Sequence, residues 1–197
     1  ELINFDLELT NPSMIHEQEK LELLTQQVEI AGTLSLLADH NPGAVAEAVP
    51  ELKETLSYGD NNLRRASTET LSKIAYSNPE AVAEAVPELI RVLKRGKPDA
   101  KEYSIDALTT LAEKIPERLA DSVPDLVSRG SEIYDASREW DEAKLSEGSP
   151  IINLLVKIGE SNHESILEAV PLFASTLRVS LNKENYYEQN NPVINLL

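Results

Sequence analysis

The 197-residue sequence has no cysteine, seven glycines and only 5% aromatic residues. The lack of cysteine excludes disulfides, thiol nucleophiles and cysteine-ligated metals. Leucine, alanine and valine dominate the hydrophobic 41% of the chain, a composition typical of packed helices rather than sheets. No apolar run approaches the roughly 20 residues of a membrane-spanning helix, and the first residues do not resemble a signal peptide. We therefore expect a cytoplasmic protein without a membrane segment.

Positive charge is also scarce. Eighteen lysines and arginines stand against 34 aspartates and glutamates, which gives a formal net charge of -16. Binding to the phosphate backbone of DNA or RNA relies on many basic side chains, so nucleic acid is an unfavourable partner. The charge suits a basic protein or peptide better. The sequence leaves the partner's identity and the oligomeric state open.

The dominant pattern is an internal repeat. The nonapeptide AVAEAVPEL fills residues 44–52 and recurs at residues 81–89, 37 positions later. Two further series share steps of 37, 37 and 47 residues, and because both lengthen at the same step, we place one insertion around 131–148. The series are Pro50, Pro87, Pro124 and Pro171, and Leu34, Leu71, Leu108 and Leu155.

Each repeat contains two predicted helices. The first opens with Asn-Pro, a good N-cap followed by a residue tolerated at the first helical position, and should kink or split at the later proline. The second helix carries the leucine series. Neither helix buries its apolar stripe alone, so the units must stack. Second helices are predicted at residues 62–76, 99–114 and 150–160.

The two ends of the chain depart from the repeat. In the N-terminal unit, a second helix is predicted from Leu21 to Asp39, but Glu19 stands where the first helix should carry leucine. At the other end, the last seven residues echo residues 149–155, as if a second helix stopped partway. We therefore predict one solenoid domain over 1–197. It divides into an atypical unit at 1–40, repeats at 41–77, 78–114 and 115–161, and an incomplete repeat at 162–197.

The pattern Pro87-x-Leu89-x3-Leu93, a turn, and then Ala107-Leu108-x2-Leu111-Ala112 resembles the HEAT repeat, and the split first helix is similar to the armadillo variant. The resemblance implies an all-α fold, a right-handed α-solenoid of tandem helical hairpins with a period of about 37 residues. It also implies that the second helices line a concave binding surface, without indicating any particular ligand.

Catalytic and metal-binding patterns are missing. His16-Glu17 and His163-Glu164 begin like a zinc-binding HExxH helix, but Lys20 and Leu167 occupy the closing positions. The many carboxylates pair on helix faces as often as chance would place them. We expect no enzyme, no catalytic residue, no cofactor and no metal. Some HEAT-like proteins are lyases or DNA glycosylases, and such an enzyme is kept as a minor alternative.

The candidate binding residues follow from helical geometry. At 100° per residue, the face of each second helix opposite the buried leucine stripe should line the concave surface. An ordinary solvated face is the alternative interpretation. The predicted ladder consists of Glu69, Lys73, Tyr76, Asp106, Thr110, Glu113, Asn153, Lys157 and Glu160, with Gly32, Leu36 and Asp39 in the first unit.

Two other segments are candidates. The insertion carries Tyr134 and Trp140, and together with Tyr186 and Tyr187 in the last unit it could form an aromatic, acidic edge. Trp140 would then either pack on the solenoid or serve as an exposed anchor. A basic cluster at one interhelical turn could bind an anion or be a solvated turn; it contains Arg91, Lys94, Arg95, Lys97 and Lys101.

These observations predict a protein-interaction scaffold that binds a partner protein or peptide through the concave second-helix face or the insertion edge. The alternative is a structural spacer within a larger multi-domain protein.

Overall fold

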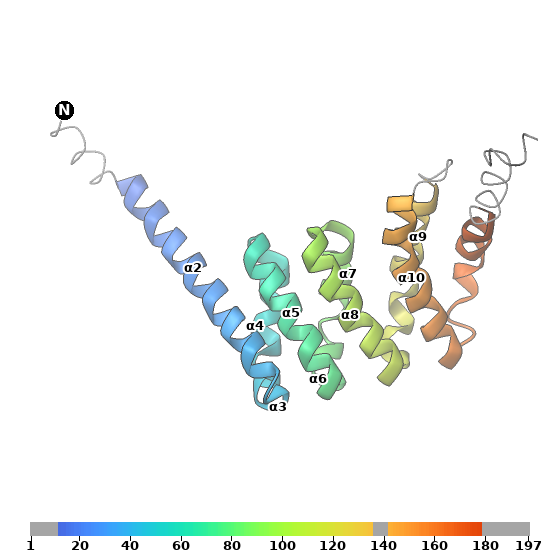
Figure 1. Cartoon of the computed structure of the whole chain (residues 1–197), viewed down its shortest axis with the longest axis horizontal. Helices are drawn as coiled ribbons and strands as arrows, with labels where there is room; N and C mark the ends of the chain where they lie inside the picture. Colours follow the sequence, from blue (N-terminus) through green and yellow to red (C-terminus); the bar gives the residue numbers. More distant parts are fainter. Residues whose placement is uncertain (1–11, 136–141, 179–197) are drawn as a thin grey trace, which may run out of the picture.

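The computed structural model describes residues 12–135 and 142–178, with side chains placed for residues 16–133 and 148–178. This part of the chain is all-helical and contains no β-strand. Its helices pair into hairpins that stand side by side in a row (Figure 1). Within the described residues, no helix has the length and apolar character needed to cross a membrane.

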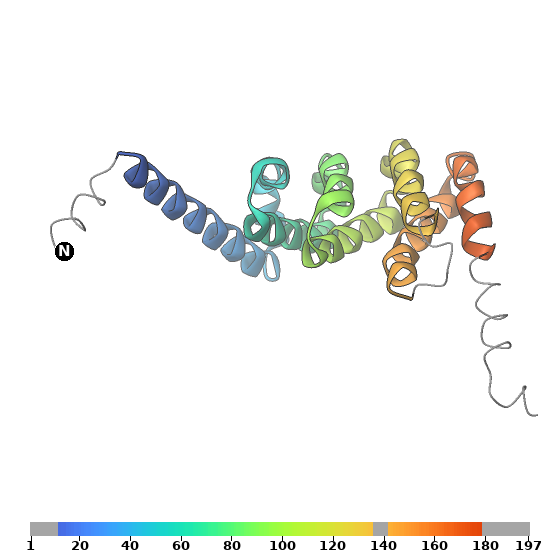
Figure 2. The same ribbon diagram turned by 90° about the horizontal axis from the view of Figure 1, so that it is seen from above.

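The helices form two layers, which are separated clearly in Figure 2. One layer contains the second helices, where α2 contacts α5, α5 contacts α8 and α8 contacts α10. The other layer contains the first helices, where α4 contacts α7 and α7 contacts α9. The second helices are α2 (Pro12–Ala38), α5 (Asn61–Ser77), α8 (Pro98–Lys114) and α10 (Glu142–Ser161).

The first helices are split at the interior proline, as predicted. The Asn41 side chain caps the first piece by accepting a hydrogen bond from the amide of Ala44 at 3.2 Å. Pro50 and Pro87 then lie in the first turn of the next piece, where a missing N–H costs little. The pieces are α3 (Pro42–Val45), η1 (Ala46–Ala48) and α4 (Val49–Tyr58); α6 (Pro79–Ala83) and α7 (Val86–Arg95); and η2 (Pro116–Ser122) and α9 (Val123–Asp135). The last described unit continues with η3 (Leu167–Ala169) and a helical segment over 170–178.

Two second helices begin and end within one residue of the prediction. The start of α5 is fixed by Asp60, whose carboxylate accepts a hydrogen bond from the amide of Leu63 at 2.8 Å. The start of α8 is Pro98. In contrast, α10 begins at Glu142 rather than at Pro150, which lies inside the helix. Most of the predicted insertion therefore lengthens α9 and α10, and only residues 136–141 between them lie outside the described part.

Helix α2 differs most from the prediction. It starts at Pro12 instead of Leu21 and runs without a break to Ala38. Only its C-terminal part is buried against the rest of the molecule, through Ala31, Ser35 and Ala38. No first helix folds back within residues 12–38, so α2 extends away from the hairpins (Figure 1).

The core runs between the two layers. Leu71, Leu108 and Leu155, the predicted leucine series beyond the first unit, are fully buried. Buried hydroxyls near them donate hydrogen bonds to backbone carbonyls: Ser104 Oγ lies 2.6 Å from the Leu89 oxygen, and Thr70 Oγ1 lies 2.8 Å from that of Ala66. Their polar groups are thus satisfied without water.

Candidate partner-binding face

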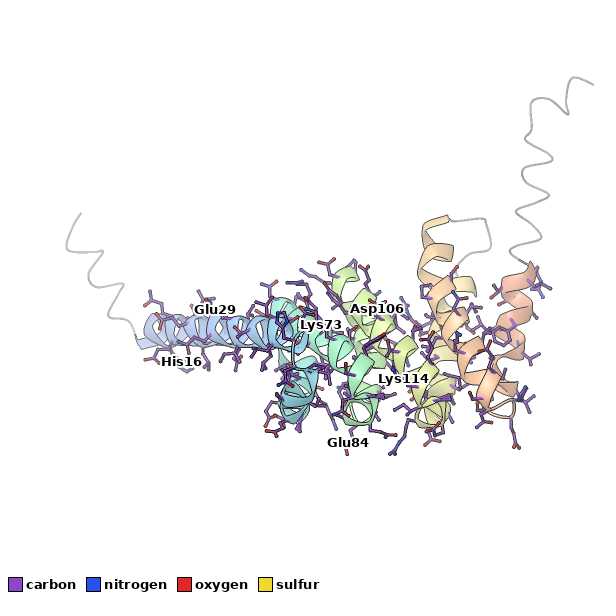
Figure 3. The ribbon with its side chains drawn as sticks, turned by 60° about the horizontal axis from the view of Figure 1, so that its bottom comes forward. His16, Glu29, Lys73, Glu84, Asp106 and Lys114 are labelled. Atoms are coloured by element: carbon purple, nitrogen blue, oxygen red, sulfur yellow. The ribbon has the colours of Figure 1, made fainter. Side chains whose placement is uncertain are left out.

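The predicted ladder residues lie on the side of α5, α8 and α10 that faces away from the first-helix layer. Figure 3 places Lys73 on α5 and Asp106 and Lys114 on α8, whereas Glu84 lies on the other layer. Tyr76, Asp106, Glu113, Asn153 and Glu160 are exposed, and Glu69, Lys73, Thr110 and Lys157 are partly exposed. These nine residues, with Asp39, are called the ladder face below.

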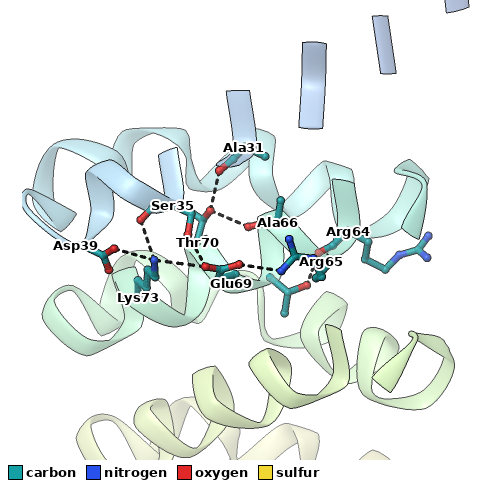
Figure 4. A network of polar contacts seen from close by, with 10 residues as sticks. Ala31, Ser35, Asp39, Arg64, Arg65, Ala66, Glu69, Thr70 and Lys73 are labelled. Carbon is teal, nitrogen blue, oxygen red and sulfur yellow. Dashed lines mark hydrogen bonds and ion pairs between the residues drawn. The ribbon is translucent and has the colours of Figure 1, made fainter. Parts of the chain in front are cut away.

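A polar network fixes the part of the ladder face between α2 and α5 (Figure 4). Lys73 Nζ lies 2.9 Å from Asp39 Oδ2, 3.5 Å from Glu69 Oε1 and 3.2 Å from the backbone oxygen of Ser35. The Ser35 hydroxyl donates to Glu69 Oε1 at 3.1 Å, and Arg65 lies 3.3 Å from Glu69 Oε2. Both carboxylates and the ammonium are therefore held in one arrangement across two helices.

The network changes the pKa of Lys73. Partial burial disfavours its charged form, but the hydrogen bond to Asp39 and the negative charges of Asp39 and Glu69 together outweigh burial. The pKa of Lys73 is thereby raised above its usual 10.5. Because the folded-state pKa is the higher one, the stabilisation is fully present below the unfolded-state pKa and is lost as the pH rises through the folded-state value.

We therefore expect Lys73→Gln to lower the free energy of unfolding by at most about 1 kcal/mol, because the ion pair between Lys73 and Asp39 lies near the surface. This loss should not change with pH near neutrality. The difference from wild type should begin to shrink above the unfolded-state pKa of 10.5 and disappear as the pH rises through the higher folded-state pKa of Lys73. Urea unfolding of both proteins at about pH 7 and about pH 11.5 measures this difference. A difference that disappears near neutral pH would contradict the assignment.

Cross-helix contacts continue along the ladder face. The ammonium of Lys114 on α8 lies 5.0 Å from the centroid of the Tyr76 ring on α5, a cation–π contact. Lys157 on α10 lies 3.9 Å from Glu113 on α8 and 3.8 Å from Glu160. Each pair of neighbouring second helices is thus joined by a lysine.

This pairing sets the electrostatics of the ladder face. Arg65, Lys73, Lys114 and Lys157 lie among its carboxylates, so the charge of the face is nearly balanced. Asp106 is the exposed carboxylate of the ladder face that has no ion-pair partner among the described residues. It is therefore the position most available to a cation from outside.

Some residues of the predicted basic cluster at the α7–α8 turn are engaged in contacts within the fold. Arg91 donates to the Ser57 hydroxyl at 2.6 Å, and Lys94 is paired with Asp125, so both connect neighbouring first helices. Arg95 and Lys97 are exposed and have no ion-pair partner in the described part. A small hollow of about 230 Å³ lies beside Arg95.

The aromatic edge is not described by the structure. Tyr134 belongs to α9, but its side chain is among those not placed. Trp140, Tyr186 and Tyr187 lie outside the described residues. The edge remains a prediction from the sequence.

No group of three or more histidine, aspartate or glutamate side chains in the described part could hold a metal ion. His16, His40 and His163 are exposed and lie on separate segments. No protein-family model, curated protein or solved structure matches this chain. Its function must therefore be inferred from its surfaces.

One surface was missed by the sequence reasoning. Leu34 belongs to the repeating leucine series and was expected to be buried, yet it is only partly buried, and Leu37, three residues further on, is 49% exposed. Together with Ile30 they form an apolar stripe on α2. The signal was present in Glu19, since a missing leucine there indicates that no first helix covers the stripe.

Proposed function

We propose that this chain is a right-handed α-solenoid similar to HEAT and armadillo proteins, and that it binds a partner protein or peptide along the ladder face. The observation that carries the proposal is the continuity of this face: one row of polar side chains crosses α2, α5, α8 and α10, with a lysine joining each neighbouring pair. A segment lying across the row would meet every helix in turn.

The cross-helix contacts suit such a role energetically. Binding costs about 0.5–1.5 kcal/mol for each flexible side chain that becomes ordered. Contacts with a neighbouring helix already hold Lys73, Glu69 and Lys157, so binding of a partner loses less free energy to the ordering of these side chains. An ordered polar face is also what distinguishes a binding surface from a solvated spacer.

Tyr76 and Asp106 are the residues proposed to contact the partner most strongly. Tyr76 is 72% exposed, and a large exposed aromatic ring is a frequent energetic anchor of interfaces. Asp106, with its free carboxylate, would pair with a lysine or arginine of the partner. A basic protein or peptide that also carries an apolar contact for Tyr76 is therefore the proposed ligand.

The test is capture from a lysate of the source organism with three forms of the chain as bait. Tyr76→Ala combined with Asp106→Lys should reduce capture of a specific protein at least about tenfold, because loss of an interface anchor costs about 2 kcal/mol or more. Tyr58→Ala is the matched control, since this tyrosine is 90% exposed but lies on the first-helix layer. Equal capture by all three baits would remove the ladder face as the binding site, and no specific capture would favour the spacer.

A further inference from the structure

Helix α2 lacks the partner that every other second helix has. Among the described residues, α5 packs on α4, α8 on α7 and α10 on α9, whereas α2 packs on α5 and the short α3. Ile30, Leu34 and Leu37 lie 37 residues before Ser67, Leu71 and Ile74, all three of which are fully buried. In α2, Ile30 is 61% exposed. The stripe that a first helix covers elsewhere is therefore uncovered.

The uncovered stripe forms the wall of a groove. Two hollows, of about 440 and about 370 Å³, lie next to each other and share Leu34 as a lining residue. The larger is lined by α2 on one side and by α3, η1 and α4 on the other. A first helix in this place would touch its own second helix and the next first helix, as α4 touches both α5 and α7. We call these hollows the α2 groove.

Residues 1–11 are too short to fill the α2 groove as a helix. From Pro12 to Ile30 the axis of α2 rises by about 27 Å, at about 1.5 Å per residue. A helix of eleven residues is only about 16 Å long, so one that turned back at Pro12 would end before the groove begins. Residues 1–11 therefore do not supply the helix that fits this groove.

The charge around the α2 groove indicates its occupant. Glu29 lines the smaller hollow, and Glu47 and Glu51 line the larger. None of the three has an ion-pair partner among the described residues. A basic segment would neutralise them, whereas a second copy of a chain with a net charge of -16 would be repelled.

An internal helix pair shows how the contact would be made. Lys94 on α7 pairs with Asp125 on the next first helix, α9. Asp125 lies 74 residues after Glu51, two repeat steps, so Glu51 holds the same place on α4. A basic residue at the position of Lys94 in a docked helix would therefore meet Glu51.

We propose that the α2 groove docks an amphipathic helix of a partner protein, which completes the N-terminal helix pair. The apolar residues of this docked helix have the spacing of Val86, Leu89 and Leu93 in α7, and a lysine or arginine follows the last of them. This site is separate from the ladder face and does not depend on the function proposed for it.

The probe is a labelled peptide with the sequence of residues 85–97, AVPELIRVLKRGK, whose binding to the full chain is followed by fluorescence anisotropy. Leu37→Glu should weaken binding at least about tenfold by placing a charge in the apolar wall. Leu36→Glu is the matched control, because Leu36 is the adjacent residue, is 67% exposed and points away from the groove. It should leave binding unchanged, as should Tyr76→Ala on the ladder face.

A charge exchange tests the orientation. Glu51→Lys should weaken binding of the peptide about three- to tenfold, and a peptide carrying Lys94→Glu should regain that affinity for the Glu51→Lys chain. Thermal unfolding of each variant shows that the fold is kept, which the exposure of Leu37 and Glu51 predicts.

Several outcomes would overturn the proposal. If neither the wild-type chain nor its Phe5→Glu variant binds the peptide, or if Leu37→Glu leaves binding intact, the α2 groove is not a helix-docking site. If sedimentation shows a dimer that Leu37→Glu dissociates, the occupant is a second copy instead. If the full chain binds the peptide only after Phe5→Glu, its own N-terminal segment is the occupant.

Discussion

Leu111→Ala is expected to lower the free energy of unfolding by about 2–5 kcal/mol, whereas Leu37→Ala should lower it by about 1 kcal/mol or less. The two leucines are 74 residues apart and hold the same repeat position on α8 and α2. Leu111 is fully buried, so its truncation leaves a cavity in a packed core. Leu37 faces the α2 groove and is 49% exposed, so it has little burial to lose.

The comparison is made by chemical denaturation of the wild type and both variants. Stacked helix pairs can unfold in parts, so the transition is followed by circular dichroism and by hydrogen exchange of the helix that carries each substitution. Equal losses for the two variants would mean that the stripe on α2 is covered in solution. A loss below about 1 kcal/mol for Leu111→Ala would contradict the assignment of Leu111 to the core.

Where local chemistry and the repeat agree, the sequence predicted the helices closely. Asp60 is a strong N-cap, Pro98 is suited to a first helical turn, and the buried leucines recur at helical spacing. The bounds of α5 and α8 follow from these residues. The split of the first helices at Pro50 and Pro87 follows equally from the missing backbone N–H of proline.

The predicted α2 and α10 were too short, because no residue before their predicted starts stops a helix. Between Pro12 and Ala38 the chain is rich in leucine, glutamate and glutamine, and its only glycine is Gly32; such residues favour one uninterrupted helix. Glutamate, alanine, lysine and leucine over residues 142–145 likewise extend α10 ahead of Pro150. In both places, helix propensity prevailed over the register of the repeat.

The ion pairs of the ladder face could not be predicted from helical wheels. Lys73 and Asp39 were both predicted on this face, but their ion pair joins positions 34 residues apart, at the end of α2 and on α5. Such pairs depend on how neighbouring helices are spaced, and one sequence does not fix that spacing. The same holds for the α2 groove, since the sequence shows a degenerate first helix without showing that α2 replaces it.

Arg64→Ala is expected to lower the free energy of unfolding by about 1–3 kcal/mol, because hydrogen bonds from a charged donor contribute more than neutral ones. The Arg64 guanidinium donates to the backbone oxygens of Leu56 at 3.0 Å and Gly59 at 2.8 Å, and to Asn61 Oδ1 at 3.3 Å. It thus caps the C-terminal end of α4 from the start of α5, where the helix has unpaired carbonyls and partial negative charge.

The adjacent Arg65 provides the control. Its one ion pair, with Glu69 on the same helix, is partly exposed to solvent, so Arg65→Ala should cost about 0.5 kcal/mol or less. Arg64→Lys keeps the charge but loses the planar fork, so it should recover less than half of the stability. Full recovery by lysine would show that charge alone matters at this position. Because α4 forms one wall of the α2 groove and α5 carries part of the ladder face, loosening their turn should also weaken binding at both surfaces.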